Sequence, residues 1–335
     1  MTGEPLLDVR DLKVSFRTED GLVKAVDGVS LTLFEGETLG IVGESGSGKS
    51  VTMMSVMRLI NDPNARFEGE VLYKGHDLMT LNRDQMRAIR GTGISMIFQD
   101  PMTSLNPVYR VGAQIAEQIR AHDHVSKQAA RDRVIELLAA VGIPQAAHRV
   151  DNYPHEFSGG MRQRVMIAIA LSCDPEIILC DEPTTALDVT IQDQILRLLT
   201  QLCRESGVSL VFVTHDLPVV AQVCHDVAVM YGGQIVERGE VRDVLLDPRH
   251  PYTLGLVRSA PDFEYVRESL LPIPGSPPSL VSPPSGCRFH PRCAFAEDDC
   301  RTSQTPLRPL PGGRFTACLH YERTLEAVEA DRARP

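Results

Sequence analysis

The chain has 335 residues, of which 43% are hydrophobic and 23% are charged, and its formal net charge is −10. These proportions are typical of a globular protein with one large domain and room for a smaller appended module. The negative charge argues against a nucleic-acid surface, which needs a concentrated basic patch. No apolar stretch approaches the roughly 18 residues that cross a bilayer, and the N-terminus has no secretory pattern, so we expect a cytoplasmic protein.

The N-terminal part of the sequence alternates hydrophobic and polar residues. Leu12, Val14 and Phe16 recur at a period of two, and the pattern continues over residues 23–33, which predicts β-strands. A short apolar strand is predicted over residues 38–42. A glycine-rich loop follows it, and then a helix from Ser50 to about Ile60.

The glycine-rich loop between this strand and this helix fits the phosphate-binding pattern G-x-x-x-x-G-K-[ST]. Its residues are Gly43, Glu44, Ser45, Gly46, Ser47, Gly48, Lys49 and Ser50, and Val51 continues into the helix. The glycines let backbone N–H groups point at an anion, and the helix start adds its positive dipole end. We expect Lys49 to neutralise the β- and γ-phosphates of ATP and the Ser50 hydroxyl to bind Mg²⁺.

The middle of the chain predicts a helical segment between two sheet-forming parts. A strand over residues 94–98 leads into Gln99, and residues 101–157 are mostly helical, with a clear helical period over residues 129–141. Strands are then predicted over residues 177–180, 208–213 and 227–230. A helix is predicted over residues 189–203, with one apolar face formed by Ile191, Ile195, Leu198, Leu199 and Leu202. This alternation of strands and helices predicts a mostly parallel sheet covered by helices, with the helical segment as an inserted lobe.

Two adjacent carboxylates, Asp181 and Glu182, follow the apolar run of residues 177–180. By itself such a pair is a weak signal, because many strands end in polar residues at solvent. Together with a phosphate loop it predicts that Asp181 holds Mg²⁺ and that Glu182 polarises the attacking water.

The C-terminal part differs in composition from the rest. Residues 272–284 contain six prolines in thirteen positions, which excludes a helix or central strand and predicts an extended tether. Four of the eight cysteines follow it, namely Cys287, Cys293, Cys300 and Cys318, whereas the other four are predicted to be core residues (Cys173, Cys180, Cys203 and Cys224). In a reducing compartment the clustered set indicates a metal site rather than disulfides.

Further motifs resemble those of the ABC ATPases over about residues 5–260. Ser158, Gly159 and Gly160 resemble the signature loop of this family, although Met161 stands where the family usually has glutamine. The other landmarks appear in the family's order. They are Gln99 for the Q-loop, Ala186-Leu187-Asp188 for the D-loop, His215 for the switch histidine, and Phe16 for the aromatic side chain that stacks on adenine.

The resemblance implies an α/β P-loop NTPase fold of the ABC type and a composite ATPase site. The expected fold has an N-terminal antiparallel β part, a mostly parallel core sheet, a helical lobe at about residues 100–160 and a small Cys-rich extension. Two such domains would meet head to tail, each ATP lying between one phosphate loop and the other domain's residues 158–160. Glu182 would be the catalytic base, His215 would contact the γ-phosphate, and Ser50, Gln99 and Asp181 would surround Mg²⁺.

The sequence beyond residue 250 resembles the C-terminal extension of the oligopeptide and dipeptide (and nickel) importer ATPases. The resemblance rests on the run 250–253 (His-Pro-Tyr-Thr) and on residues 272–275 and 286–293, together with residues 99–107. It implies an ABC domain over residues 1–260 and a tether with a Cys-rich module over residues 261–335. It also implies a second, usually different ATPase chain, two membrane permease subunits and an extracytoplasmic substrate-binding protein, with no nucleic acid, so this chain would sit peripherally at the cytoplasmic face. The alternative is a soluble ABC ATPase that acts on nucleic acid or ribosomes.

The four clustered cysteines are separated by five, six and seventeen residues. The simple zinc pattern of two close Cys pairs is absent, and an all-Cys set of four suits a [4Fe–4S] cluster. Zinc, with His290 or His320 as a substitute ligand, and unmetallated thiols remain the alternatives. In the importer subfamily such a cluster would be structural or regulatory.

Overall fold

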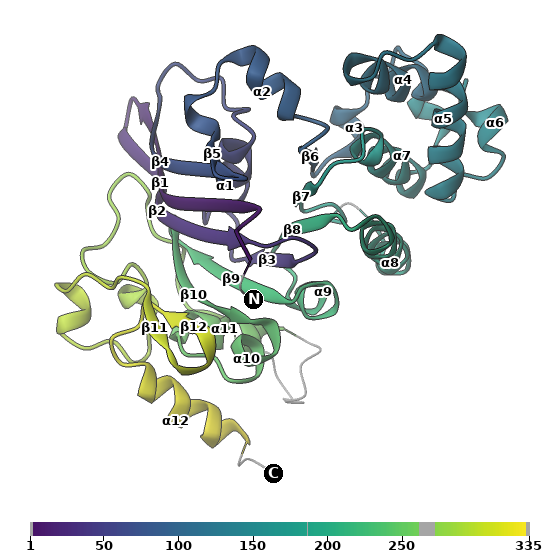
Figure 1. Ribbon diagram of the computed structural model, residues 1–335. Helices are drawn as coiled ribbons and strands as arrows, with labels where there is room; N and C mark the ends of the chain where they lie inside the picture. Colours follow the sequence, from purple (N-terminus) through teal and green to yellow (C-terminus); the bar gives the residue numbers. More distant parts are fainter. Residues whose placement is uncertain (1–2, 186, 261–271, 333–335) are drawn as a thin grey trace. The chain divides into compact units, whose positions relative to one another are not determined.

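The structure is a computed structural model that describes residues 3–185, 187–260 and 272–332 (Figure 1). Ala186 of the predicted D-loop and residues 261–271 of the predicted C-terminal segment lie outside the described residues. The chain forms two compact units. The first consists of residues 1–79 and 212–335, and the second consists of residues 80–211.

The first unit contains a four-stranded antiparallel sheet in the order β2-β1-β4-β5. Its strands are β1 (Leu7–Thr18), β2 (Gly21–Leu33), β4 (Ala65–Tyr73) and β5 (His76–Asp77). In β1, Leu12 and Val14 are buried and Phe16 is half-buried, so the predicted alternation is confirmed. Phe16 pairs with Val23 of β2 on one side and with Ala65 of β4 on the other.

Five strands of a second, eight-stranded sheet lie in the same unit, in the order β11-β12-β10-β9-β3. The strands are β3 (Thr38–Val42), β9 (Asp226–Tyr231), β10 (Gln234–Glu240), β11 (Arg308–Leu310) and β12 (Arg314–Thr316). β3 is parallel to β9 and every residue of β3 is buried, as expected for a strand covered on both faces. β10 pairs antiparallel with both β9 and β12, so the C-terminal segment extends this sheet. The boundary between the two units falls within β8 (Ser209–Thr214).

The helices of the first unit are α1 (Lys49–Val56), α9 (Leu217–Val223), α10 (Val241–Leu246), α11 (Pro251–Ser259) and α12 (Tyr321–Arg332). α1 ends earlier than the predicted Ile60. Arg58 has a φ of 48°, in the left-handed region that terminates helices, although apolar residues continue to Ile60. Residues 272–284 form neither helix nor strand, as predicted, and the Leu280 carbonyl accepts a hydrogen bond from the Lys24 N–H at 2.9 Å.

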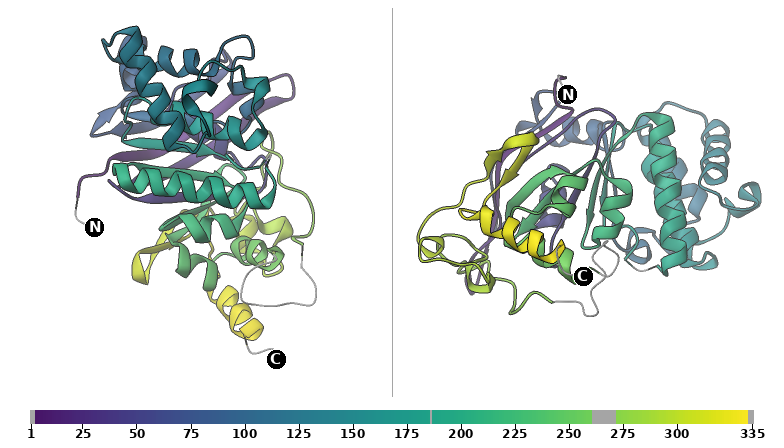
Figure 2. Two further views of the ribbon diagram at one scale, coloured as in Figure 1. Left: turned by 90° about the vertical axis from the view of Figure 1, so that its right-hand side faces the viewer. Right: turned by 90° about the horizontal axis from the view of Figure 1, so that it is seen from below.

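The second unit contains two parallel strands and most of the helices. The strands are β6 (Ile94–Ile97) and β7 (Ile177–Asp181), and every residue of both is buried. The helices are α2 (Arg83–Ile89), α3 (Pro101–Ser104), α4 (Val111–His122), α5 (Lys127–Ala140), α6 (Ala146–Arg149), α7 (Gly159–Leu171) and α8 (Val189–Ser206). Figure 2 gives two further views of these helices. The helical character predicted for residues 101–157 is confirmed.

The predicted apolar face of α8 is partly wrong. Ile195 and Leu199 are buried as expected, but Leu196 and Cys203 complete the buried face, whereas Ile191, Leu198 and Leu202 are only half-buried. The helix turns Leu196 inward, and the sequence period alone does not distinguish this rotation because both faces carry leucine. Of the four predicted core cysteines, Cys173, Cys180 and Cys203 are buried and Cys224 is half-buried.

None of the helices in the described ranges combines the length and the hydropathy that a bilayer-spanning segment requires.

Glu37, immediately before β3, gives the first unit a pH-dependent contribution to stability. Burial, as the largest cause, and a hydrogen bond with Asp226 together raise the pKa of this carboxyl group to about 7. The folded state therefore holds a proton that the unfolded chain releases near pH 4.5, so this contribution to stability is lost as the pH rises through about 7. We expect the melting temperature of the wild type to fall relative to Glu37→Gln between about pH 5 and about pH 8 in calorimetric scans. Identical pH profiles for the two proteins would contradict this assignment.

Candidate nucleotide site and cysteine module

The phosphate loop connects β3 to α1 in the first unit. Its C-terminal end, at Gly48, packs tightly against β2. Gly48 precedes α1 with a φ of 103°. A Cβ atom at this position would lie 2.3 Å from the Ala25 carbonyl oxygen of β2, far inside any real contact distance. Only glycine can therefore occupy position 48 without moving the loop or the strand.

The side of the loop that faces α1 is buried, and its tip is open. Lys49 is 4% exposed, and its Nζ donates to the carbonyl oxygens of Gly43 at 2.8 Å and Glu44 at 3.0 Å. The Ser47 hydroxyl is buried with no hydrogen-bond partner within the described ranges. Gly46 is exposed, and no atom lies within 4 Å of where its Cβ would be. The loop thus presents a buried cation below an open backbone tip, an arrangement that suits a phosphate group.

Other predicted residues of the nucleotide site lie in the same unit. Ser50 and Val51 are half-buried in the first turn of α1, where the helix dipole favours an anion. Phe16 is half-buried near the end of β1, so part of its ring is accessible for stacking. His215 directly follows β8 and is exposed.

The second unit brings the predicted Gln99 and Glu182 together. Asp181 is buried at the end of β7, and Glu182 follows it with a φ of 46°. The left-handed region is unfavourable for a residue with a side chain, and such strain is concentrated at functional positions. The Glu182 carboxylate accepts hydrogen bonds from Gln99 Nε2 at 3.1 Å and from the Thr185 hydroxyl at 3.0 Å, which hold it in one orientation.

The predicted signature and D-loop residues begin two neighbouring helices of the second unit. Ser158 caps α7, its hydroxyl accepting from the Met161 N–H at 3.4 Å, and Asp188 caps α8, its carboxylate accepting from the Ile191 N–H at 3.0 Å. Ser158, Gly159 and Asp188 are exposed. A Cβ at Gly160 would lie 2.7 Å from a methyl group of Ile191, so the two helix starts pack closely because position 160 is glycine.

The predicted site residues are therefore divided between the two units. The phosphate loop, Phe16 and His215 belong to the first unit. Gln99, residues 158–160, the two carboxylates and Asp188 belong to the second, and the structure describes each set within its own unit.

The four clustered cysteines of the first unit line one small cavity of about 20 Å³. Most of its other lining residues are aromatic, aliphatic or imidazole side chains, among them Phe289, Phe295, His290 and His320, and Thr305 adds a hydroxyl group. Burial raises the pKa of the thiols of Cys293, to about 11, and of Cys318, to about 12, and it also raises the pKa of Cys287. Four thiols converging on one largely apolar cavity are a donor set that fits a thiolate-bound metal centre, whose charge would favour the thiolate forms.

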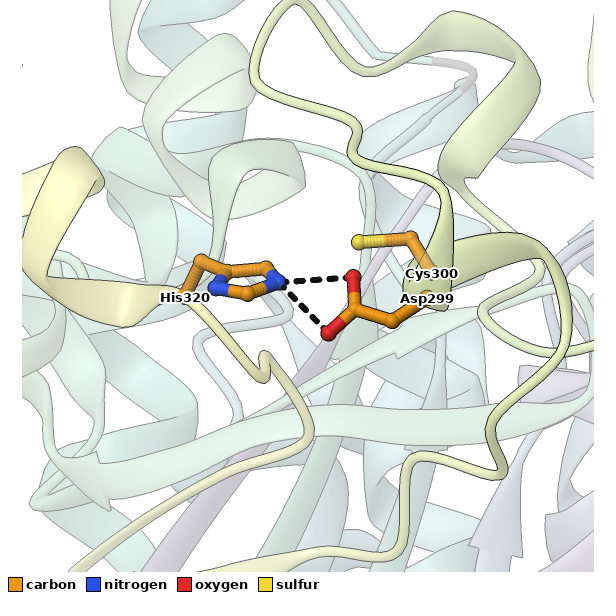
Figure 3. Close-up of side chains that lie close together, drawn as sticks. All are labelled: Asp299, Cys300 and His320. Carbon is orange, nitrogen blue, oxygen red and sulfur yellow. Dashed lines mark hydrogen bonds and ion pairs between the residues drawn. The ribbon is translucent and has the colours of Figure 1, made fainter.

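One of these cysteines also lies beside a histidine and a carboxylate (Figure 3). Ligand atoms of Asp299, Cys300 and His320 all lie within 4.8 Å of one another. His320 Nε2 contacts both carboxylate oxygens of Asp299, at 2.9 and 3.0 Å, and this contact lowers the pKa of Asp299. The imidazole nitrogen is thus already engaged by a carboxylate, whereas the Cys300 thiol lines the cavity.

The sequence did not predict that the C-terminal segment contacts the phosphate loop. His250 caps α11, its Nδ1 accepting from the Tyr252 N–H at 3.1 Å, and burial lowers the pKa of His250 to about 3, so this nitrogen remains an acceptor. Tyr252 reaches the loop, where its hydroxyl oxygen accepts the Glu44 N–H at 2.8 Å. The Arg292 guanidinium pairs with the Glu44 carboxylate at 2.7 and 3.0 Å. Opposite charge was the only signal in the sequence, and the two residues are 248 positions apart.

Comparisons with known proteins match both parts of the chain. Residues 26–185 match the family described as ABC transporter, and residues 236–300 match the oligopeptide/dipeptide transporter C-terminal region. The oligopeptide transport ATP-binding protein OppD of Bacillus subtilis (strain 168) is 55% identical over 293 residues, covering 87% of this chain and 82% of that protein. OppD of Escherichia coli (strain K12) is 49% identical over 316 residues, covering 94% of this chain and 93% of that protein.

A solved structure with a similar fold is an ATP-binding cassette in a dimeric, post-hydrolysis state bound to ADP and Pi. It has a TM-score of 0.63 and 29% identity, and the match covers 70% of this chain and 99% of that one. The expected fold class, with its antiparallel part and its buried parallel strands, is confirmed by this likeness. With the phosphate loop and the two family matches on one chain, the protein belongs to the ABC transporter ATPases, within the subfamily of oligopeptide and dipeptide importer ATP-binding subunits.

Proposed function

We propose that this chain is the ATP-hydrolysing subunit of a membrane importer for di- or oligopeptides. The observation that carries the proposal is that an ABC ATPase region and an oligopeptide-transporter C-terminal region occur on one chain. The names of the relatives support the same cargo class. The partner proteins would select which solute is transported and, for peptides, what length is accepted.

The nucleotide would be bound mainly by the phosphate loop. Residues 43–51 would surround the phosphates, Lys49 would exchange its two loop carbonyls for phosphate oxygens, and Phe16 would stack on adenine. Ser50, Gln99 and Asp181 are oxygen donors, which suit Mg²⁺, the ion that would neutralise developing phosphate charge. Glu182 would accept the proton of the attacking water, and His215 would hold the γ-phosphate.

The signature residues would complete the site of a second ATPase chain. Ser158 caps a helix of thirteen residues that begins with Gly159 and Gly160, and Ser158 and Gly159 are exposed, so this helix start favours the γ-phosphate of an ATP bound to another chain. Asp188 would lie at the same interface. Binding of ATP across the interface would close the pair and hydrolysis would open it, which is a population shift that depends on the ligand.

We further propose that the partners are a second, different ATPase chain, two permease subunits and an extracytoplasmic substrate-binding protein. The chain would then lie peripherally at the cytoplasmic face of the membrane. Residues 1–260, with the helical lobe at about 100–160, would form the ATPase domain, and residues 261–335 would form the tether and Cys-rich module.

Affinity purification from the native membrane tests this function. We expect permease subunits and a second ATPase to co-purify, and the reconstituted complex to import peptide into vesicles only with hydrolysable ATP. Recovery of nucleic acid or ribosomes in place of membrane subunits would refute the importer and favour a soluble ABC ATPase.

The four thiols of the module would hold a metal centre, for which we propose a [4Fe–4S] cluster with zinc as the alternative. The all-Cys donor set fits the cluster, and the cysteine spacing lacks the two close Cys pairs of the simple zinc pattern. Either group would cross-link residues 287–318 and so supply structural stabilisation.

Iron analysis distinguishes these alternatives. Chain purified without oxygen is expected to contain about four iron and four sulfide per chain and to absorb visible light, and Cys293→Ala is expected to lose most of both. The matched control is Cys224→Ala, which removes a thiol of the same unit that lies outside the cavity and should leave the iron content unchanged. About one zinc per chain would establish the alternative, and a colourless, metal-free protein would refute both.

A further inference from the structure

The segment between the first two clustered cysteines carries two arginines that point toward the phosphate loop and its support. Arg292 precedes Cys293, and its side chain is only 6% exposed. Its two terminal nitrogens bind the two carboxylate oxygens of Glu44 at 2.7 and 3.0 Å, a bidentate geometry that fixes direction as well as distance. Its Nε donates to the Pro274 carbonyl at 2.8 Å, so the guanidinium also binds the proline-rich tether.

Glu44 is held through every polar group it has. Its N–H donates to the Tyr252 hydroxyl, its carbonyl oxygen accepts from Lys49 Nζ, and its carboxylate pairs with Arg292. Two of these three contacts come from residues beyond position 250, one from Tyr252 of α11 and one from Arg292 of the cysteine module. A loop residue bound in this way cannot rotate without breaking a hydrogen bond, and Glu44 is the second residue of the phosphate loop.

The second arginine, Arg288, contacts a turn that is hydrogen-bonded to the phosphate loop. Arg288 donates to the Gly232 carbonyl oxygen and pairs with the Asp27 carboxylate. The neighbouring Gly233 N–H donates to the Ser47 carbonyl oxygen of the phosphate loop at 2.9 Å. Gly232 and Gly233 form the turn between β9 and β10, so this turn lies between the loop and the cysteine module.

We propose that Arg292 is a positioning residue for ATP binding, which holds the phosphate loop in its binding geometry through Glu44. The cysteine module is then part of the nucleotide site's support, and whatever fixes Cys287 and Cys293 also fixes the segment that carries Arg292. This inference rests on the proposed role of the loop as the ATP site. The physical reason is preorganisation, because a loop that is already held in the bound shape loses less conformational entropy when the ligand binds.

The test is ATP binding by the full-length chain, measured by calorimetry with ATP and Mg²⁺. Arg292→Gln is expected to raise the Kd for ATP about tenfold, and Arg292→Lys, which retains the charge but not the bidentate pair, is expected to raise it less. Arg301→Gln is the matched control, because it removes the same charge from an exposed position of the same module. In the assembled complex, Arg292→Gln should raise the KM for ATP while kcat changes little.

Glu44→Gln separates positioning from folding, since it leaves the cysteine module intact. It should weaken ATP binding to a similar extent without changing iron content, and Arg292→Gln/Glu44→Gln should bind no more weakly than the weaker single variant. Wild-type affinity in both single variants, or additive losses in the double variant, would overturn the inference. Failure of the wild type itself to bind ATP would instead refute the proposed function.

Discussion

Replacing Glu182 with glutamine is expected to lower the rate of ATP hydrolysis by at least about a hundredfold while ATP binding is retained. Glutamine keeps an oxygen that can accept the hydrogen bonds from Gln99 and Thr185, so the side chain should stay in place. It cannot, however, accept the proton of the attacking water at neutral pH. The measurement is phosphate release by the assembled complex at saturating ATP, with Kd determined in parallel.

The control for this substitution is Glu205→Gln, which makes the same change on the exposed surface of α8. It should leave turnover at the wild-type level. Near-normal hydrolysis by Glu182→Gln in the complex would exclude Glu182 as the catalytic base. Loss of ATP binding together with hydrolysis would mean that the carboxylate acts in binding.

Replacing Gly48 with alanine is expected to weaken ATP binding by about a hundredfold or more, because the phosphate loop must move. The added Cβ would lie 2.3 Å from the Ala25 carbonyl oxygen and 2.8 Å from the Met230 methyl group. The methyl group can rotate away, but the carbonyl belongs to the backbone of β2. A loop displaced by even about 1 Å presents its N–H groups at the wrong positions for the phosphates. Calorimetric titration with ATP and Mg²⁺ provides the measurement.

Gly36→Ala is the matched control for the backbone strain. Gly36 also has a positive φ, 71°, but no atom lies within 4 Å of its Cβ position. Alanine there should cost about 1 kcal/mol of stability, visible as a lower melting temperature, with ATP affinity unchanged. If Gly48→Ala binds ATP as tightly as Gly36→Ala does, the clash with the Ala25 carbonyl does not displace the phosphate loop from its ATP-binding conformation.

Elements whose formation depends on residues that are close in the sequence could be predicted from the sequence. The parallel strand β3, the loop that follows it and the strand that ends at Asp181 were expected at nearly their observed bounds. The end of α1 was missed because Arg58 adopts a left-handed conformation, although no glycine or proline at this position signals the end of a helix. The rotation of α8 was partly missed because leucines occur on more than one side of the helix.

The sequence by itself determined the strand-end pair of carboxylates and the glycine-rich loop, and it predicted that this loop binds phosphate and that residues 158–160 form a signature loop. Each is a short run whose local backbone sets its chemistry, and spacing along the chain is enough to recognise it. Only the tertiary structure decided that Tyr252 and Arg292 hold Glu44 and that four distant thiols share one cavity. Those contacts depend on sheet pairing, such as Glu237 of β10 opposite Thr316 of β12, which joins the C-terminal strands to the sheet that contains β3. A pairing of opposite charges 248 positions apart has many possible partners in sequence, and the packed core selects one.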